Sequence, residues 1–412
     1  MYRMKRLGAA AVALALSLSL GAFAQPASAA NQVIKIGIEL PISGNDASDG
    51  IPMEQAATLA IEQANAHAPK GFTFQADALD DTVNGIHNPQ QGVANIRALA
   101  ADPGVIGVVG PFNSNVAAAE IPVSNQALLP LVSPAATDPT LTQSPRYRPA
   151  HPDEFTFFRV SASNDKQAHA AAYSCKQLGL KSIYVIDDNE TFGTGLANIF
   201  TDAAKSLSLT ILGRDHLTVN QQDFRPLLTR IAQMHPDAIY YGGVTSTGGA
   251  LLRKQMADSG FDTAKTPFVA SDGIYDQAFV KIAGPQADDT YFTAAAPNIT
   301  KLVSAREFIS AYQERYHTAP TAFAANAFVA AQVIINATVK AIQSNHGDRP
   351  SRAEVLKQLR ATKEFHSIVG TFGFDASGDT TNPSMALWKI EHGTPSYLHA
   401  IDMRAVKKVV KS

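Results

Sequence analysis

The sequence has almost no cysteine, since Cys175 is the only one among 412 residues. A disulfide within the chain is therefore excluded, and so is a zinc site with two thiolate ligands. Charge of one sign is not in excess either, because 34 Lys and Arg residues face 36 Asp and Glu residues, for a formal net charge of −2. No basic stripe suited to a phosphate backbone is present, so nucleic acid is not expected as a partner. A chain of this length needs large hydrophobic cores, in roughly two domains.

The sequence also lacks a complete catalytic or metal-binding motif. Ser163 begins an S-x-x-K sequence, but the S-D-N and K-T-G partners of penicillin-recognising enzymes are missing. The stretch 193–198 matches a dinucleotide fingerprint until Asn198, which replaces the last glycine. No G-x-S-x-G or H-E-x-x-H sequence occurs. Cys175 lies in a helical pattern and is predicted to be a buried, inert thiol. We therefore expect no enzyme activity, no catalytic residues, no cofactor and no metal.

The first thirty residues differ from the rest of the chain. Basic residues precede an uninterrupted stretch of mainly small apolar residues at 7–24, and small-x-small sequences follow it. This order is typical of an export signal, and we expect residues 1–29 to be removed by cleavage after Ala29. A membrane anchor is the alternative, since the stretch is near the lower length limit for a span, but its Ala and Gly content and the following Pro26 favour the signal. Without a cysteine near the cleavage point, the product is expected to be free in the periplasm and not embedded in the membrane.

From residue 34 onward, short β-branched stretches alternate with longer amphipathic ones, which is typical of an α/β protein with parallel sheets covered by helices. Strands are predicted at 34–40, 72–78, 105–109, 128–132, 157–160, 182–186, 238–241, 267–270 and 291–294. Helices are predicted at 53–67, 89–101, 116–127, 166–178, 195–207, 224–234 and 249–259. Further helices are predicted at 303–316, 323–344 and 352–360, and late strands at 386–390 and 396–400. Polar residues interrupt 323–344, so this is expected to be a core helix. The basic residues after position 403 are expected to form a solvated terminus.

Polar residues fall where three of the predicted strands end. Ser114 opens a helix after 105–109, Thr137 lies in the loop after 128–132, and Asp272 follows 267–270. Ligands of open α/β sheets bind at the carboxyl ends of the strands. The hydroxyls and unpaired amides of the first two loops suit a carboxylate, and Asp272 suits an ammonium, so together they suit a zwitterion. Taken singly, each residue is better explained as a helix cap or a turn residue; their joint placement points to a site.

At these loops the sequence resembles the leucine/isoleucine/valine-binding family of periplasmic solute-binding proteins, which serve ABC importers. The resemblance extends over nearly the whole mature chain. It implies the type I periplasmic binding protein fold, in which two lobes are joined by three crossings and the ligand is held in the cleft. Residues 30–158 and 296–383 would form the first lobe, and residues 159–295 and 384–412 the second. The similar stretches are Ile36-Gly37-Ile38, Pro41-Ile42-Ser43-Gly44, Val132-Ser133-Pro134-Ala135-Ala136-Thr137, Phe192-Gly193-Thr194-Gly195, Tyr240-Tyr241-Gly242-Gly243 and Ser271-Asp272-Gly273.

Carried over residue by residue, the resemblance implies a ligand site made from both lobes. The family's carboxylate-holding serine falls on Ser114. The carbonyl and the hydroxyl that accept the ammonium fall on Ala135 and Thr137, with Ala136 between them. The acid that completes the ammonium site falls on Asp272, which is shorter by one methylene than the glutamate often found there.

The remaining site positions show where this chain departs from the branched-chain pattern. Aromatic wall positions fall on Phe192 and Phe323. Val244 stands where a tyrosine commonly follows the two glycines, an aromatic residue of the first loop is replaced around Asp49, and Asn113 occupies a position that is cysteine in some members. Asp49 either faces a polar or cationic ligand side chain or is exposed without ligand contact. The ligand side chain is therefore left open between branched aliphatic and polar or basic.

The resemblance implies an extracytoplasmic, monomeric substrate-binding protein that delivers an amino acid, branched-chain or related, to the membrane permease of an ABC importer. The alternative is a periplasmic sensor or binding protein for an amide, urea or an aromatic carboxylate. A ligand without an amine would favour the alternative, because Asp272 would then have no ammonium to bind.

Overall fold

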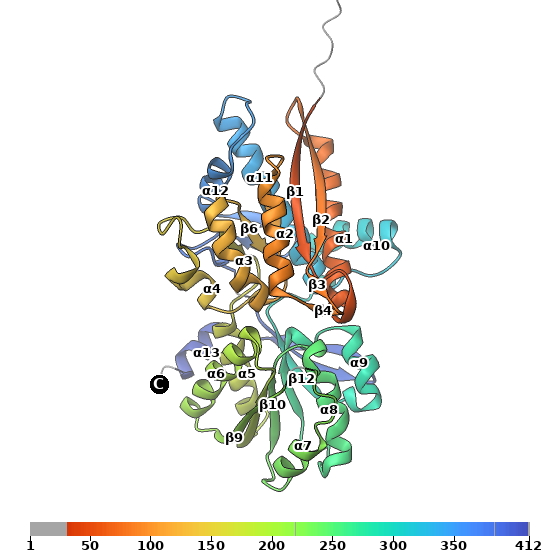
Figure 1. The fold of residues 1–412 in the computed structure, drawn as a ribbon. Helices are drawn as coiled ribbons and strands as arrows, with labels where there is room; N and C mark the ends of the chain where they lie inside the picture. Colours follow the sequence, from red (N-terminus) through yellow and green to blue (C-terminus); the bar gives the residue numbers. More distant parts are fainter. Residues whose placement is uncertain (1–30, 219, 383, 411–412) are drawn as a thin grey trace, which may run out of the picture.

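The computed structural model describes residues 31–410 except 219 and 383, and the predicted signal at 1–29 lies outside these residues. A five-stranded parallel sheet with the order β2-β1-β5-β6-β7 forms the centre of the first lobe, the upper one in Figure 1. Its strands are β1 (Gln32–Leu40), β2 (Phe72–Asp80), β5 (Val105–Val109), β6 (Leu131–Ser133) and β7 (Phe157–Arg159). The predicted parallel sheet covered by helices is confirmed for this lobe.

A seven-stranded sheet with the order β16-β15-β12-β11-β10-β8-β9 forms the centre of the second lobe. Strands β8 to β12 are parallel, whereas β15 pairs antiparallel with β12 and with β16. The late strands of the chain therefore extend one edge of this sheet. Its strands are β8 (Ser182–Asp187), β9 (Thr210–His216), β10 (Ala238–Gly242), β11 (Phe268–Ser271), β12 (Thr290–Ala294), β15 (Ala386–Glu391) and β16 (Thr394–Ala400).

Helices cover both faces of the first sheet, as the fully buried strand β5 requires. Ile106 and Val109 pack into the core under α1 and α11, while Val105 and Val108 pack under α2 and α3. A strand buried on both faces is a continuous apolar stretch rather than an alternating one. The helices of this lobe are α1 (Ala47–Ala64), α2 (Pro89–Ala101), α3 (Ser114–Ala127), α4 (Thr140–Gln143), α10 (Arg306–Tyr316), α11 (Ala322–Ser344) and α12 (Arg352–Arg360).

Helix α11 is long and apolar enough to cross a membrane by length and composition, but 83% of its most apolar window is buried inside the protein. It packs against α1, α12 and β5. The prediction of a core helix is therefore confirmed. The Asn326 side chain on this helix donates a hydrogen bond to the carbonyl of Pro134 at 3.0 Å, so α11 also contacts the loop after β6.

Two helices of the second lobe, α9 (Gln277–Ala283) and α13 (Met403–Val410), are not predicted from the sequence. Helix α13 packs against α5, where Val406 is buried beside Met385 and Ile401, and Figure 1 shows it on the lower lobe. The basic side chains of Arg404, Lys407 and Lys408 are exposed, as predicted, but they belong to a helix rather than to a free terminus, because one face of this segment is apolar and docks. The helices are α5 (Asn164–Gln177), α6 (Thr191–Ser206), α7 (Arg225–Ala232), α8 (Ala250–Met256), α9 (Gln277–Ala283) and α13 (Met403–Val410).

Two short antiparallel hairpins complete the fold, β3 (Thr82–Val83) with β4 (Ile86–His87) and β13 (Phe365–Ser367) with β14 (Gly370–Phe372). The β3-β4 hairpin lies at the lower end of the first lobe, next to the second lobe (Figure 1). It places the side chain of His87 between the lobes, where it contacts Glu190.

The strand predicted at 128–132 is shorter than expected. Leu128 has a left-handed backbone conformation, with φ of 49°, and its amide caps the carbonyls that end α3. This is a common way to end a helix, so β6 begins only at Leu131.

Candidate ligand-binding site

A cavity lies between the two lobes and is lined by residues of both. Counted to its opening, it contains about 390 Å³ of space that no protein atom fills. The structure brings together seven of the ten predicted site residues in the lining, but Ala136, Thr137 and Asp49 are not part of it. Phe112, Glu190 and Gly273 are lining residues that the sequence does not single out. The lining residues are Phe112, Asn113, Ser114, Ala135, Glu190, Phe192, Val244, Asp272, Gly273 and Phe323.

The first lobe contributes the start of α3 to this cavity. The Ser114 hydroxyl accepts hydrogen bonds from the amides of Thr137 at 3.2 Å and Asp138 at 3.3 Å, and it still has its own proton to donate. Asn113 precedes the helix without capping it. Its Oδ1 atom is buried and has no hydrogen-bond partner within the described part of the chain. A hydroxyl proton at a helix N-terminus suits a carboxylate, because the helix dipole favours negative charge there.

The loop after β6 is held by hydroxyl groups. Ser133 Oγ accepts from the amides of Ala135 at 3.2 Å and Ala136 at 2.8 Å, while Ser114 Oγ accepts from the next two amides of the loop. The prediction of unpaired amides in this loop is therefore wrong. The free group is instead the Thr137 hydroxyl, which is 1% exposed and has no partner among the described residues. Because buried polar groups are normally hydrogen-bonded, this hydroxyl lacks an expected partner, although Thr137 is not among the residues that line the cavity.

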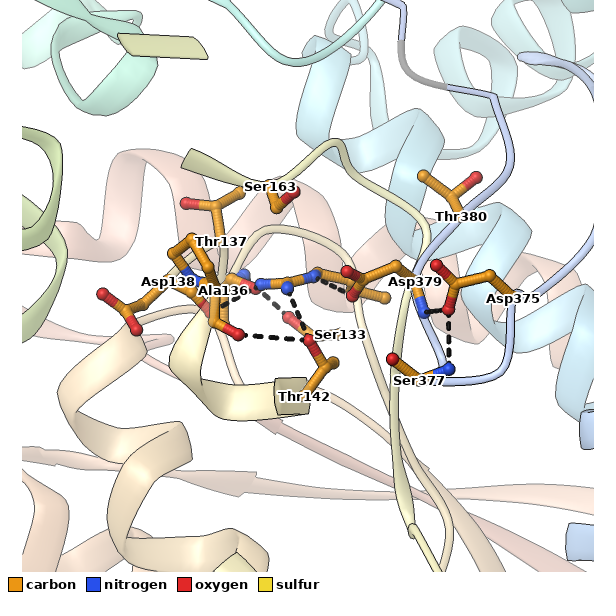
Figure 2. Close-up of polar contacts among 12 residues, drawn as sticks. Ser133, Ala136, Thr137, Asp138, Thr142, Ser163, Asp375, Ser377, Asp379 and Thr380 are labelled. Carbon is orange, nitrogen blue, oxygen red and sulfur yellow. Dashed lines mark hydrogen bonds and ion pairs between the residues drawn. The ribbon is translucent and has the colours of Figure 1, made fainter. Parts of the chain in front are cut away.

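The fully buried Arg159 fixes the same loop from behind. Its guanidinium donates to the carbonyls of Ala136 at 3.3 Å and Asp138 at 2.8 Å, and to the hydroxyl of Thr142 at 2.9 Å. Its Nε donates to Asp379 Oδ1 at 2.7 Å. Figure 2 shows these loop residues on one side and Asp379 on the other. One rigid planar group thus joins the loop to a segment more than two hundred residues away in the sequence.

The second lobe contributes Asp272, which follows β11 and is 4% exposed. Its Oδ2 atom accepts a hydrogen bond from the amide of Ala295 at 2.9 Å. Burial raises the pKa of this carboxyl to about 6, although hydrogen bonds from Ala295 and Gln167 oppose the shift. The next residue must be a glycine, because a Cβ atom at Gly273 would lie 2.4 Å from the carbonyl oxygen of Gly243. A ligand ammonium beside Asp272 would keep the carboxylate ionised.

Aromatic rings form the apolar part of the lining. Phe112 and Phe323 contact each other edge to face, with ring centroids 5.8 Å apart, and both belong to the first lobe. Phe192 and Val244 lie opposite, on the second lobe. This part of the cavity suits an aliphatic or aromatic group of a ligand.

His87 joins the two lobes beside the cavity, which the sequence does not reveal. The ring is buried, with Nδ1 2.6 Å from Asp46 Oδ2 in the first lobe and Nε2 3.0 Å from Glu190 Oε2 in the second. Burial opposes a charge on the ring, but the hydrogen bonds to Asp46 and Glu190 outweigh it and raise the pKa of His87 well above its ordinary value. A charged imidazole between two carboxylates therefore holds the lobes together.

Asp49 is buried close to the cavity. It is only 8% exposed, so the alternative that it is an exposed residue is wrong, and its Oδ1 atom has no hydrogen-bond partner among residues 31–410 other than the undescribed 219 and 383. Burial, followed by the negative charges of Asp276, Asp46 and Asp272, raises its pKa well above the ordinary value. The lobe interface near Asp49 is thus rich in acidic groups.

The single cysteine, Cys175, is buried in α5, as predicted, and burial raises its pKa to about 12. Over residues 31–410, apart from 219 and 383, no group of three or more His, Cys, Asp or Glu side chains is arranged to hold a metal ion.

Comparison with known proteins gives matches over most of the chain. The sequence profile of the family described as periplasmic binding protein matches residues 33–395. A Leu/Ile/Val-binding protein homolog 3 of Brucella melitensis is 30% identical over 369 residues, which are 89% of this chain and 94% of the relative. The Leu/Ile/Val-binding protein BraC3 of Rhizobium johnstonii is 29% identical over 364 residues, 87% of this chain and 92% of the relative.

Solved structures share the fold. The leucine binding protein LivK of Thermotoga maritima superimposes with a TM-score of 0.78 at 23% identity, covering 90% of this chain and 99% of that one. The substrate binding protein LivJ of Streptococcus pneumoniae, in complex with isoleucine, gives 0.77 at 24% identity with the same coverage. A solute binding protein of R. palustris in complex with 4-hydroxybenzoate gives 0.77 at 18% identity, covering 92% and 100%. At these identities the similarity establishes the two-lobe fold.

Proposed function

Because the chain belongs to the periplasmic binding protein family, we propose that it is the extracytoplasmic substrate-binding protein of an ABC importer and binds an α-amino acid, branched-chain or related, between its lobes. The relatives of 30% and 29% identity are named for leucine, isoleucine and valine. The family supports a role in binding rather than catalysis, and we include the absence of enzyme activity in the proposal.

The observation that carries the proposal is that Ser114 and Asp272 line one cavity from opposite lobes. The carboxylate of the amino acid accepts from the Ser114 hydroxyl at the start of α3. The ammonium donates to Asp272, to the carbonyl of Ala135 and to the free hydroxyl of Thr137. The two ends of the zwitterion thus bind to groups of opposite character.

The side chain of the amino acid lies in the apolar part of the cavity. Phe192, Val244 and Phe323 surround this space, and Phe112 supports Phe323 from the side. Aromatic and aliphatic walls favour apolar groups without fixing one shape, which is consistent with a branched-chain or related side chain.

Binding closes the lobes. The amino acid first contacts the first lobe, residues 30–158 and 296–383, and the second lobe, residues 159–295 and 384–412, then brings Asp272 onto the ammonium. The segments that join the lobes, near Arg159 and Pro297, absorb the rotation of this hinge. Both charges of the ligand must be paired, because an unpaired buried ion costs several kcal/mol.

The cellular context of the proposal follows from the sequence. Export with cleavage after Ala29 places the protein in the periplasm as a monomer, and the closed form delivers the ligand to a membrane permease. A sensor or a binding protein for an amide, urea or an aromatic carboxylate remains the competing function, and the ligand decides between them.

The test begins with protein unfolded and refolded to remove bound solute. Thermal shifts are measured with the twenty amino acids and with a set of carboxylates that includes benzoates, since a tight ligand raises the melting temperature by mass action. The best ligand is then titrated into Asp272→Ala, for which a loss of about 2–5 kcal/mol of binding free energy is expected. Asp258→Ala is the matched control, because Asp258 is exposed. Unchanged affinity in Asp272→Ala, or a preferred solute without an amine, would contradict the proposal.

A further inference from the structure

The segment that begins α1 brings two carboxyl groups to the interface between the lobes. Asp46 precedes the helix and Asp49 lies in its first turn, and they are 6% and 8% exposed. Asp46 is occupied, because it accepts from His87 at 2.6 Å. Asp49 Oδ1 has no hydrogen-bond partner among the residues that the structure describes. A buried carboxylate in this condition is unfavourable unless a cation or a proton satisfies it.

The charges around Asp49 do not include a base. Its strongest electrostatic neighbours are Asp276 of the second lobe, then Asp46 and Asp272, and all of them are acidic. The histidine of this region, His87, is already shared by Asp46 and Glu190. Asp276 accepts from Thr245 Oγ1 and from a backbone amide at the start of α9, and each carboxylate oxygen can accept a further hydrogen bond. Asp49 of the first lobe and Asp276 of the second therefore raise the local negative potential together, and we refer to them as the acidic pair.

A separate observation in the cavity points to the same ligand chemistry. Asn113 Oδ1 belongs to a lining residue that is 6% exposed, and this acceptor has no donor in the described part of the chain. The ammonium of an amino acid has three N–H donors, and Asp272, Ala135 and Thr137 account for them in the proposed function. Asn113 Oδ1 and Asp49 Oδ1 therefore remain as acceptors for donors on another part of the ligand.

We propose that the bound solute carries a second cationic group, an amine or a guanidine at the end of its side chain, which lies between Asp49 and Asp276 in the closed form. This inference rests on the proposed function and narrows its substrate class to basic amino acids. The aliphatic part of such a side chain lies against Phe192 and Phe323, since the methylenes of long cationic side chains cover apolar surface while the charged end stays polar. The apolar wall and the acidic pair then bind different parts of one side chain.

The test compares ligands of the same shape and different charge. Arginine and citrulline form one pair, and lysine and norleucine form another, with affinities measured by calorimetry on stripped protein. The charged member of each pair is expected to bind about tenfold more tightly or better. In Asp49→Asn the ratio of the two affinities is expected to fall towards one. Glu314→Gln, which removes an exposed acid of α10, should keep the wild-type ratio.

The outcomes separate this inference from the proposed function. If leucine or norleucine binds and the charged ligands do not, the second cation is wrong and the amino-acid function stands. If no amino acid binds, both are wrong. A ratio that is unchanged in Asp49→Asn would also overturn the inference. If Asp49→Asn does not fold, Asp276→Asn replaces it, because asparagine can still cap α9. The affinities of the wild-type protein for the two ligand pairs also test, without any variant, whether a second cation is bound.

Discussion

The contact between His87 and Glu190 provides a direct test of how the lobes stay closed. In the structure the ring of His87 lies between Asp46 of its own lobe and Glu190 of the other. Only the second contact is lost when the lobes separate. A hydrogen bond between charged groups contributes about 1.5–3 kcal/mol. His87→Gln is therefore expected to weaken ligand binding roughly 10- to 150-fold, by destabilising the closed form.

The same contact predicts the direction of a pH dependence. The pKa of His87 is raised well above its ordinary value in the closed form, and it is lower in the open form, where Glu190 is absent. The contact therefore stabilises closure fully below the open-form pKa and is lost as the pH rises through the closed-form pKa. Asp81 also faces His87, but burial raises the pKa of Asp81 to about 9, so this carboxyl is largely protonated near neutral pH. Affinity should fall with rising pH.

The assay is calorimetric titration of the preferred ligand from about pH 6 to about pH 9, with His87→Gln measured in parallel to subtract the titration of the ligand itself. Glu190 also lines the cavity, so Glu190→Gln alone does not isolate the contact. The double variant does, because the two losses should not add if they come from one interaction. Additive losses, or a wild-type affinity with the same pH profile as His87→Gln, would refute this account.

Two further predictions concern buried charges of the first lobe. Glu39 and Glu120 are fully buried side by side, and burial raises the pKa of Glu39 to about 7 and that of Glu120 well above its ordinary value. Their protons stabilise the folded form. The shift of Glu39 alone lowers the free energy of unfolding by on the order of 3 kcal/mol as the pH rises from the unfolded pKa to about 7, and Glu120 adds to this fall and extends it to higher pH. Glu120→Gln should flatten the fall in thermal melts, and an unchanged pH slope would contradict it. Arg159→Lys should weaken ligand binding at temperatures where the variant is folded, because the lysine ammonium lacks the planar, fixed donors with which the guanidinium binds both loop carbonyls. Asp379→Asn changes only the partner outside the loop, so it should lower the melting temperature with little effect on the affinity for the ligand. A lower melting temperature in Arg159→Lys without weaker ligand binding would contradict the role of Arg159 in positioning the loop.

The parts of the fold that are predictable from the sequence are those with a local pattern. The bounds of β5 and α2 agree with the prediction, since a buried parallel strand is an unbroken apolar stretch and Pro89 marks the start of a helix. Strand β9 is missed because it lies at the edge of its sheet and its residues are mostly half-exposed and polar. Helix α13 is missed because its charged residues hide the apolar side that Val406 buries.

The site is predictable to the extent that it lies at strand ends. Six of the seven predicted residues in the cavity lining follow strands of the two sheets, and parallel strands of one sheet end at the same edge. Phe323 lies instead at the start of α11. The contacts that hold these residues are not predictable in the same way. His87 and Glu190 are 103 positions apart, and Arg159 and Asp379 are 220 apart. Such pairs form through the packing of whole elements, and no spacing in the sequence marks them.

The interface between the lobes combines one contact that favours closure with several groups that oppose it. The His87 contact is made by protein groups alone. Asp49, Asp272 and Asp276, in contrast, are carboxyl groups whose pKa values are all raised, chiefly by burial. Their ionised forms are therefore unfavourable at the interface unless a cation is bound. On the proposed function, the cationic groups of the solute interact with these carboxyl groups only when both lobes contact the ligand, and this differential affinity shifts the lobes to the closed form.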